Sequence, residues 1–264
     1  MALNGELPMK NRKHDGLGIL KEHIKTYPHM EVRDACKLIY QSIFGGGHMI
    51  PDPSYSLKRL QDEFLEYNSM EGETLEYIGK GTCRIYLNVV KAGLSLETLN
   101  QMFVISANHK KGTIETLEEY LEELLKQCEN RVLPFEYEEC KRFVEIWKKQ
   151  GYPAISHSET YRFHYKPAYR VVDEAYVKYY PVFCEIDRLL AKEKDNNRPV
   201  IVCIDGMAGS GKSTLGHCFR RFINAICSIW MTFSFNPIKE QRNVWRNRAV
   251  MWIIDVLKKK YTIR

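Results

Sequence analysis

The chain has 264 residues, 44% of them hydrophobic and 27% charged, so it has enough apolar side chains for one large or two modest domains. Its apolar runs are too short to span a membrane, and the N-terminal residues show no signal-peptide pattern. The eight cysteines form no CxxC pair, and the eight histidines show no metal-ligand spacing. We therefore expect a cytoplasmic protein with reduced, buried thiols and no membrane partner.

The net charge of +6 is concentrated at one end of the chain. Residues 217–264 contain 10 Lys and Arg against 2 Asp and Glu, which leaves 29 basic and 31 acidic residues in 1–216. The basic excess that would suggest a nucleic-acid partner therefore belongs to the last fifth of the chain. This distribution argues against nucleic acid as the main partner.

Residues 1–150 are predicted to form a mainly helical domain whose role no motif indicates. An amphipathic helix is expected from Glu31 to Phe44, where the run Gly45-Gly46-Gly47 ends it. Further helices are predicted after a cap at Ser54 or Ser56, after Ser95, after Thr113, and from Phe135 to Gln150. Tyr77 to Val90 mixes β-branched residues with glycines, and either an extended segment or the start of a helix fits it.

Two glycine-rich stretches of this domain have both a functional and a plain interpretation. Gly45-Gly46-Gly47-His48, with Asp52 downstream, has residues for a metal or phosphate site, but a helix C-cap followed by a loop is the interpretation we favour. Gly79-Lys80-Gly81 offers a cation between glycines but lacks the full spacing of a phosphate-binding loop. We favour a plain turn there.

Residues 151–198 are interpreted as a connecting segment that contains the domain boundary. Tyr161 to Val172 interleaves aromatic and cationic residues, as nucleic-acid surfaces do, but the same alternation is typical of a half-buried strand. We favour packing, with Arg170 as the residue expected to reach a ligand. Asp173 is predicted to cap a helix that restarts at Pro181 and ends near Lys194.

The strongest functional signal begins at Pro199. Val200–Ile204 is a short β-branched run that predicts a buried strand, and the spacing G-x-x-x-x-G-K-[ST] follows it directly. Glycines at these positions let backbone N–H groups surround a phosphate chain, which predicts that the loop binds nucleotide. Lys212 is the expected catalytic phosphate cation, and the Ser213 hydroxyl is the expected ligand of Mg²⁺, with ATP as the nucleotide. The predicted nucleotide-binding residues are Gly206, Met207, Ala208, Gly209, Ser210, Gly211, Lys212, Ser213 and Thr214.

With this strand and loop, residues 199–216 resemble the P-loop (Walker A) kinases of the uridine kinase and phosphoribulokinase group. The resemblance implies an α/β P-loop NTPase fold with a central parallel sheet. It also implies transfer of the ATP γ-phosphate to a hydroxyl of a nucleoside or other small molecule. In that family a second strand ends in an Asp-Asp-Phe-type motif, whose aspartate serves the acceptor hydroxyl and the metal.

Residues 217–264 depart from this family, because they contain no glycine and no Asp-Asp motif. Trp230 and Met231 each have a single codon, so a frame read one base earlier turns Trp230-Met231-Thr232 into a forced Asp-Asp pair. This pair falls about 19 residues after Lys212, the spacing that the resemblance implies. We therefore hypothesise that the reading frame slipped near Cys218-Phe219, so that 217–264 is an out-of-frame, poorly ordered basic tail.

Together these observations predict an incomplete parallel P-loop sheet that starts at residues 199–216, after a connecting segment at 151–198 and a mainly α-helical domain at 1–150. We expect the chain to bind nucleotide but to have little or no kinase activity towards its unknown acceptor. One alternative is an ATP-dependent regulatory NTPase without a small-molecule acceptor. Another takes the tail at face value, as a nucleic-acid-binding arm that carries Arg242, Arg246, Arg248 and Lys258-Lys259-Lys260.

Overall fold

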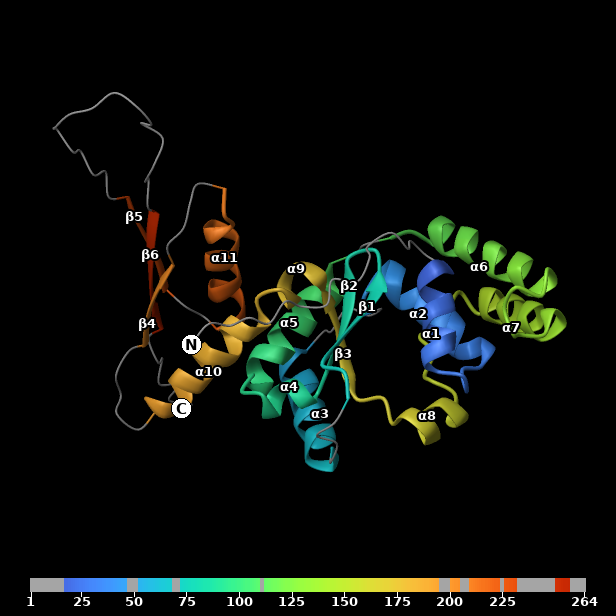
Figure 1. The fold of residues 1–264 in the computed structure, drawn as a ribbon, viewed down its shortest axis with the longest axis horizontal. Coiled ribbons are helices and arrows are strands. Elements are labelled where there is room, and N and C mark those ends of the chain that lie inside the picture. Colours follow the sequence, from blue (N-terminus) through green and yellow to red (C-terminus); the bar gives the residue numbers. More distant parts are fainter. Residues whose placement is uncertain are drawn as a thin grey trace, which may run out of the picture. The chain divides into compact units, whose positions relative to one another are not determined.

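The computed structural model describes residues 17–46, 52–67, 72–109, 112–194, 200–204 and 209–223, and the backbone of 226–231 and 250–256. The described residues form a mixed α/β protein, which confirms the coarse fold class (Figure 1). They fall into two compact units. Unit 1 comprises the described residues up to Ala92 together with Met102–Lys178, and unit 2 comprises Gly93–Gln101 together with the described residues from Tyr179 onward.

Most helices belong to unit 1, and the predicted ones are present. They are α1 (Leu17–Thr26), α2 (Val32–Phe44), α3 (Pro53–Glu66), α4 (Asn88–Lys91), α6 (Ile114–Glu129), α7 (Tyr137–Lys149), α8 (Glu159–Tyr165) and α9 (Glu174–Val177). Helix α5 (Leu96–Asn108) begins in unit 2 and ends in unit 1. The predicted cap at Thr113 is confirmed, because its Oγ1 accepts a hydrogen bond from the Thr116 amide at 3.3 Å.

The start of α3 corrects the predicted cap. Asp52, not Ser54 or Ser56, is the N-cap, and its carboxylate accepts a hydrogen bond from the Ser54 amide at 2.8 Å. A carboxylate at this place also interacts favourably with the helix dipole, and Pro53 is suited to the first helical position. Gly45 is the C-cap of α2, with φ of 70°, as the favoured interpretation predicted; Gly47 and His48 lie outside the described residues.

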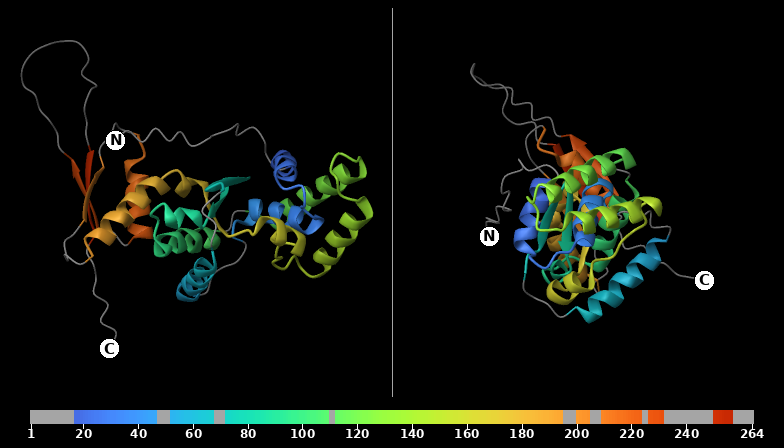
Figure 2. Two further views of the ribbon diagram at one scale, coloured as in Figure 1. Left: turned by 60° about the horizontal axis from the view of Figure 1, so that its bottom comes forward. Right: turned by 90° about the vertical axis from the view of Figure 1, so that its right-hand side faces the viewer.

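The core of unit 1 forms where α1, α2, α6 and α7 pack together. Helices α6 and α7 run side by side in Figures 1 and 2, and both contact α2. The amphipathic stripe of each helix is buried in this cluster, as shown by Ala35, Leu121 and Trp147, each at most 2% exposed. Burial of a large apolar side chain such as Leu121 contributes roughly 1.5–3 kcal/mol, so these stripes are a main source of stability in unit 1.

A three-stranded antiparallel sheet completes unit 1. Its order is β1 (Leu75–Gly79), β2 (Thr82–Tyr86) and β3 (Tyr169–Asp173). The extended interpretation of the first two strands is correct up to Tyr86, after which the short helix α4 begins. Gly79-Lys80-Gly81 is the plain hairpin turn that we favoured, with positive φ at all three residues.

The prediction of one strand over Tyr161–Val172 is wrong in its first half. Ser158 caps α8 by accepting a hydrogen bond from the Tyr161 amide at 3.1 Å, so the chain is helical up to Tyr165. Lys166, with φ of 43°, and Pro167 end this helix, and the strand begins at Tyr169. The predicted cap at Asp173 is confirmed at the start of α9.

Unit 2 contains α10 (Tyr180–Lys192), β4 (Val200–Ile204), α11 (Lys212–Phe222), β5 (Ile226–Met231) and β6 (Val250–Val256). Helices α10 and α11 pack through Phe183, whose ring lies edge-on to Phe219 and Phe222 at centroid distances of 5.1 and 5.4 Å. The strand order is β4-β6-β5, and both pairings are antiparallel. The structure therefore does not show the incomplete parallel sheet that the resemblance implies.

Two further expectations are corrected in β4. The strand was predicted to be buried, but its burial alternates and Ile201 is 61% exposed, because one face is uncovered in the described part of the chain. Cys203 is exposed on this strand, whereas the other six thiols that the structure describes are buried and unbridged. No helix within the described ranges is both long and apolar enough to cross a bilayer.

Candidate functional site

The predicted phosphate loop lies in unit 2 between β4 and α11, so the expected order of strand, loop and helix is confirmed. Gly206, Met207 and Ala208 lie outside the described residues, and Gly209 to Thr214 lie within them. Gly209 and Gly211 have φ of 77° and 85°, in the left-handed region that side chains disfavour. At Gly211 an added Cβ would also lie 3.2 Å from the Tyr179 hydroxyl. The glycine spacing is therefore matched by the backbone conformation at both positions.

Lys212 and Ser213 open α11 with different environments. Lys212 is 9% exposed, and its Nζ donates to the Ser210 Oγ at 3.4 Å. Ser213 and Thr214 are exposed, and their amides belong to the first helical turn, whose donors have no intrahelical carbonyl. A helix N-terminus with an adjacent lysine and an exposed hydroxyl provides the donors and the metal ligand that a magnesium-bound phosphate chain requires.

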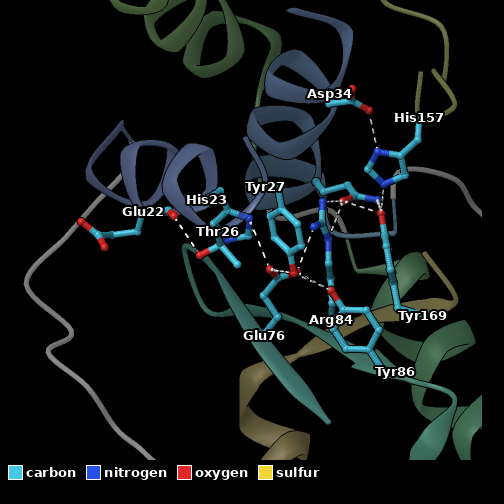
Figure 3. A network of polar contacts seen from close by, with 11 residues as sticks. Glu22, His23, Thr26, Tyr27, Asp34, Glu76, Arg84, Tyr86, His157 and Tyr169 are labelled. Carbon is cyan, nitrogen blue, oxygen red and sulfur yellow. Dashed lines mark hydrogen bonds and ion pairs between the residues drawn. The ribbon is translucent and has the colours of Figure 1, made fainter. Parts of the chain in front are cut away.

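Unit 1 contains a buried polar network that the sequence did not predict (Figure 3). Arg84 on β2 and Glu76 on β1 form an ion pair, with Nη1 and Oε2 separated by 2.9 Å and side chains 2% and 8% exposed. The hydroxyls of Tyr27 and Tyr86 donate to the same carboxylate at 2.8 and 2.9 Å. Gln41 accepts from Arg84 Nε and Nη2 at 3.2 and 2.8 Å. The network thus ties α2 and the α1–α2 turn to the sheet.

The charges of this pair are maintained by their partners. Burial on its own would raise the pKa of Glu76, but Arg84, His23 and the two tyrosine hydroxyls hold that pKa below its ordinary value. Both members are therefore ionised at neutral pH. Arg84 also lies over the Tyr169 ring, with Cζ 4.5 Å from the centroid, which adds a cation–π contact.

A second group of polar contacts joins α2 to the segment before α8. Asp34 Oδ1 lies 2.7 Å from His157 Nδ1, and Asp34 Oδ2 accepts from the Ser158 hydroxyl at 2.6 Å. His157 Nε2 lies 2.6 Å from the Tyr169 hydroxyl. Burial lowers the pKa of His157 to about 4, so the ring is neutral; it donates from Nδ1 to Asp34 and accepts from Tyr169 at Nε2.

This group has the residue types of a hydrolytic triad without its geometry. The Ser158 hydroxyl donates to Asp34 and not to His157, so the histidine is not placed to take its proton. Burial raises the pKa of Tyr169, which keeps its hydroxyl protonated. The arrangement therefore orders the chain around α8. No sequence signal indicated this role, because Asp34 lies opposite the apolar stripe of the predicted amphipathic helix and yet is buried in the structure.

The structure also places the other candidates. Arg170, expected to reach a ligand, borders a cavity in unit 1 together with His157. Asp52 acts as a helix cap, and within the described residues no group of three or more His, Cys, Asp or Glu side chains could hold a metal ion. Comparisons of the chain with protein-family models, with curated proteins and with solved structures found no match. The functional argument therefore rests on residues and geometry.

Proposed function

We propose that this chain binds ATP with Mg²⁺ at the loop Gly206–Thr214 and is related to the small-molecule kinases of the uridine kinase group. The observation that carries the proposal is the setting of the sequence motif. A strand precedes it, a helix begins at Lys212, and Gly209 and Gly211 have the left-handed conformations that a phosphate-binding loop needs.

The described residues take distinct roles in this proposal. Backbone amides from Gly209 to Thr214 bind the phosphate oxygens, assisted by the positive end of the α11 dipole. The Lys212 ammonium neutralises the β- and γ-phosphates, and the exposed Ser213 hydroxyl ligates the metal. Bound MgATP would supply the transferable phosphoryl group.

Phosphoryl transfer to a nucleoside or another hydroxyl acceptor belongs, in this proposal, to a complete parent enzyme with a parallel sheet. The family's acceptor aspartate has no counterpart in residues 217–264, where Glu240 and Asp255 are the two acidic residues. We therefore expect weak nucleotide binding and little or no transfer by this chain. The missing aspartate also favours the second candidate, a regulatory NTPase that uses ATP without a small-molecule acceptor.

Calorimetric titration of MgATP into the full chain tests the proposed site. Lys212→Ala should weaken binding about tenfold or more, because a charge-assisted contact to phosphate contributes roughly 1.5–3 kcal/mol. Lys192→Ala, which removes an exposed cation from α10 in the same unit, should leave the affinity unchanged. Equal affinities of wild type and Lys212→Ala would refute the site.

Phosphoryl-transfer assays then separate the two candidate functions. Uridine and other hydroxyl acceptors should yield little phosphorylated product with this chain. Steady ATP hydrolysis without acceptor, lost in Lys212→Ala, would favour the regulatory NTPase. Rapid phosphorylation of uridine would contradict the proposed loss of transfer activity.

A further inference from the structure

Unit 1 contains a cavity of about 780 Å³ that the proposed function does not use. Its walls come from α2, α3, α5, α8, β3 and the segment before α8, all within that unit. The volume lies in the range of small-molecule sites, which measure roughly 300–1,000 Å³. It is lined by five cationic residues, Lys37, Arg59, Arg162, Lys166 and Arg170, and we call it the cationic cavity.

The side chains that line the cationic cavity carry an excess of positive charge, and Asp34, whose Oδ1 lies 2.7 Å from His157 Nδ1, is a further carboxylate near it. Glu63 is the one carboxylate among its lining residues, and it pairs with Arg170 at 2.8 Å. Within the described part of the chain, no carboxylate forms an ion pair with Arg59, Arg162 or Lys166. Five cations and one carboxylate leave a balance of +4, because the bordering His157 is neutral.

The cations reach the cavity from two directions through regular structure. Arg162 lies on α8, Lys166 directly follows that helix as its C-cap, and both line the cavity. Arg59 and Glu63 both lie on α3. These cations line one cavity, whereas the lysines and arginines of an ordinary solvated surface are scattered over it.

Lys37 is a partly buried cation in the cavity wall. Its Nζ donates to the Ile155 carbonyl at 2.7 Å. Burial, followed by the neighbouring charges of Arg84 and Arg162, lowers the pKa of Lys37 to about 8, although Asp34 opposes this. A bound anion would relieve the repulsion among these cations.

The remaining walls suggest the shape of the ligand. Phe103 lies beneath Arg170, with Cζ 5.6 Å from the ring centroid, and Tyr55 also lines the cavity, with 62% of its surface exposed. Arginine forks match phosphate oxygens bidentately, and aromatic walls suit a ring or other apolar moiety. A balance of +4 also exceeds what a single carboxylate would neutralise.

We propose that the cationic cavity binds a phosphorylated small molecule of about nucleotide size. The cavity shares no residue with the loop at Gly206–Thr214, so this proposal does not depend on the proposed ATP binding. The volume of about 780 Å³ fits a small molecule, whereas a polynucleotide would need a continuous groove along its backbone.

The test measures binding of fructose 1,6-bisphosphate, pyrophosphate and ADP to the full-length Lys212→Ala variant, in which the phosphate loop is weakened. At least one probe should bind, and Arg162→Gln/Lys166→Gln in the same background should weaken it about tenfold or more. Both residues are exposed, so these changes should leave the fold intact. Arg142→Gln/Lys149→Gln removes two exposed cations of α7 and should not change the affinity.

Three results would overturn the proposal. One is the absence of binding by all three probes at millimolar concentration. Another is equal weakening by the two double variants, which would indicate general charge attraction. The third is a preference for another class of ligand. Citrate binding as tightly as the phosphorylated probes would be one such result. Tighter binding of a single-stranded oligonucleotide, lost when Arg162 and Lys166 are replaced, would be the other.

Discussion

Arg84 retains its charge inside unit 1 because its guanidinium has an anionic, an amide and an aromatic partner. Glu76 and Gln41 accept its hydrogen bonds, and Tyr169 lies under its plane. A buried ion pair is weak evidence of net stabilisation, but loss of one partner leaves the other charge buried and costs about 3–5 kcal/mol. The network therefore makes unit 1 sensitive to single substitutions at these positions.

Arg84→Met should lower the free energy of unfolding of the chain by about that amount, because Glu76 would remain buried without its cation. Urea denaturation followed by circular dichroism measures the change. Lys25→Met is the matched control, since it breaks the exposed pair of Lys25 and Glu22 and should give a far smaller change. A stability of Arg84→Met within error of wild type would show that the buried pair is not formed.

His157 makes the stability depend on pH in a direction that follows from its lowered pKa. The pKa is about 4 in the folded chain, against an ordinary value of 6.5 for histidine, so the unfolded state binds the proton more readily. The stabilisation is complete above pH 6.5 and is lost as the pH falls towards 4. Between pH 7 and pH 5 the loss should be about 2 kcal/mol. His23, whose pKa burial also lowers, contributes in the same direction.

Urea midpoints of wild type and His157→Gln at pH 7 and pH 5 isolate this contribution. The variant should be less stable at pH 7 but should lose less stability on acidification, while His23 acts equally in both proteins. His164→Gln, which changes an exposed histidine on α8, should behave like wild type. Equal pH dependence of His157→Gln and wild type would contradict a neutral, buried His157.

At the scale of elements, α6 depends on a local signal at its start. The Thr113 hydroxyl accepts a hydrogen bond from the Thr116 amide, and Leu117, Leu121 and Leu124 of this helix are buried in the core. Thr113→Ala should cost about 1 kcal/mol because an amide of the first turn loses its acceptor. Thr113→Ser keeps the hydroxyl and should restore most of the stability in thermal unfolding. Similar losses in both variants would assign the effect to packing of the threonine methyl.

Local signals of this kind explain which elements the sequence could predict. The stripes of α2, α6 and α7, the caps at Thr113 and Asp173, and the stop at Gly45 all lie within a few residues of the structure that they determine. The pairing of β2 with β3 joins Thr82–Tyr86 to Tyr169–Asp173, and no local pattern encodes a contact between segments so far apart. The helix α8 was missed because the alternating tyrosines were interpreted as a strand and the cap at Ser158 was not recognised.

The candidate sites were likewise predictable only where their residues are close together in the sequence. The phosphate loop is contiguous, so its residues, strand and helix could be predicted from spacing alone. The Glu76–Arg84 network and the cationic cavity assemble side chains from four or more elements, and their members look like ordinary surface charges in the sequence. Arg170 was singled out, but Lys37 and Arg59 carried no signal that distinguishes them from other helical cations.

At the scale of the whole molecule, the two units differ in how their sequences relate to their folds. Unit 1 combines periodic helices, matching helix caps and a buried ion pair with several hydrogen-bond partners. Its local sequence signals and its tertiary contacts agree, as expected of a sequence that specifies one structure. In unit 2 the phosphate loop is followed by residues 217–264, with their basic excess and no glycine. That contrast motivates the hypothesis of a slipped reading frame.

The frame hypothesis predicts a specific nucleotide sequence across codons 210–235. Strand β5 ends at Met231, and the shifted frame would place the Asp-Asp pair at the end of this strand, where the proposed kinase relationship would require it. Because Trp230 and Met231 force that pair, the discriminating features are the codons around it. The shifted frame should be open and should encode Phe after the pair and glycine turns beyond it, with acidic and basic residues in balance.

The third frame of the same DNA is the internal control, and it should contain stop codons or lack these features. A gene corrected by one base should yield a protein that phosphorylates a hydroxyl acceptor, whereas the present chain should not. Stop codons in the shifted frame, or a shifted frame without Phe after Asp-Asp, would leave 217–264 as a genuine segment. Its lysines and arginines would then need their own explanation, beginning with salt-dependent binding of nucleic acid to the full chain and its loss on deletion of 217–264.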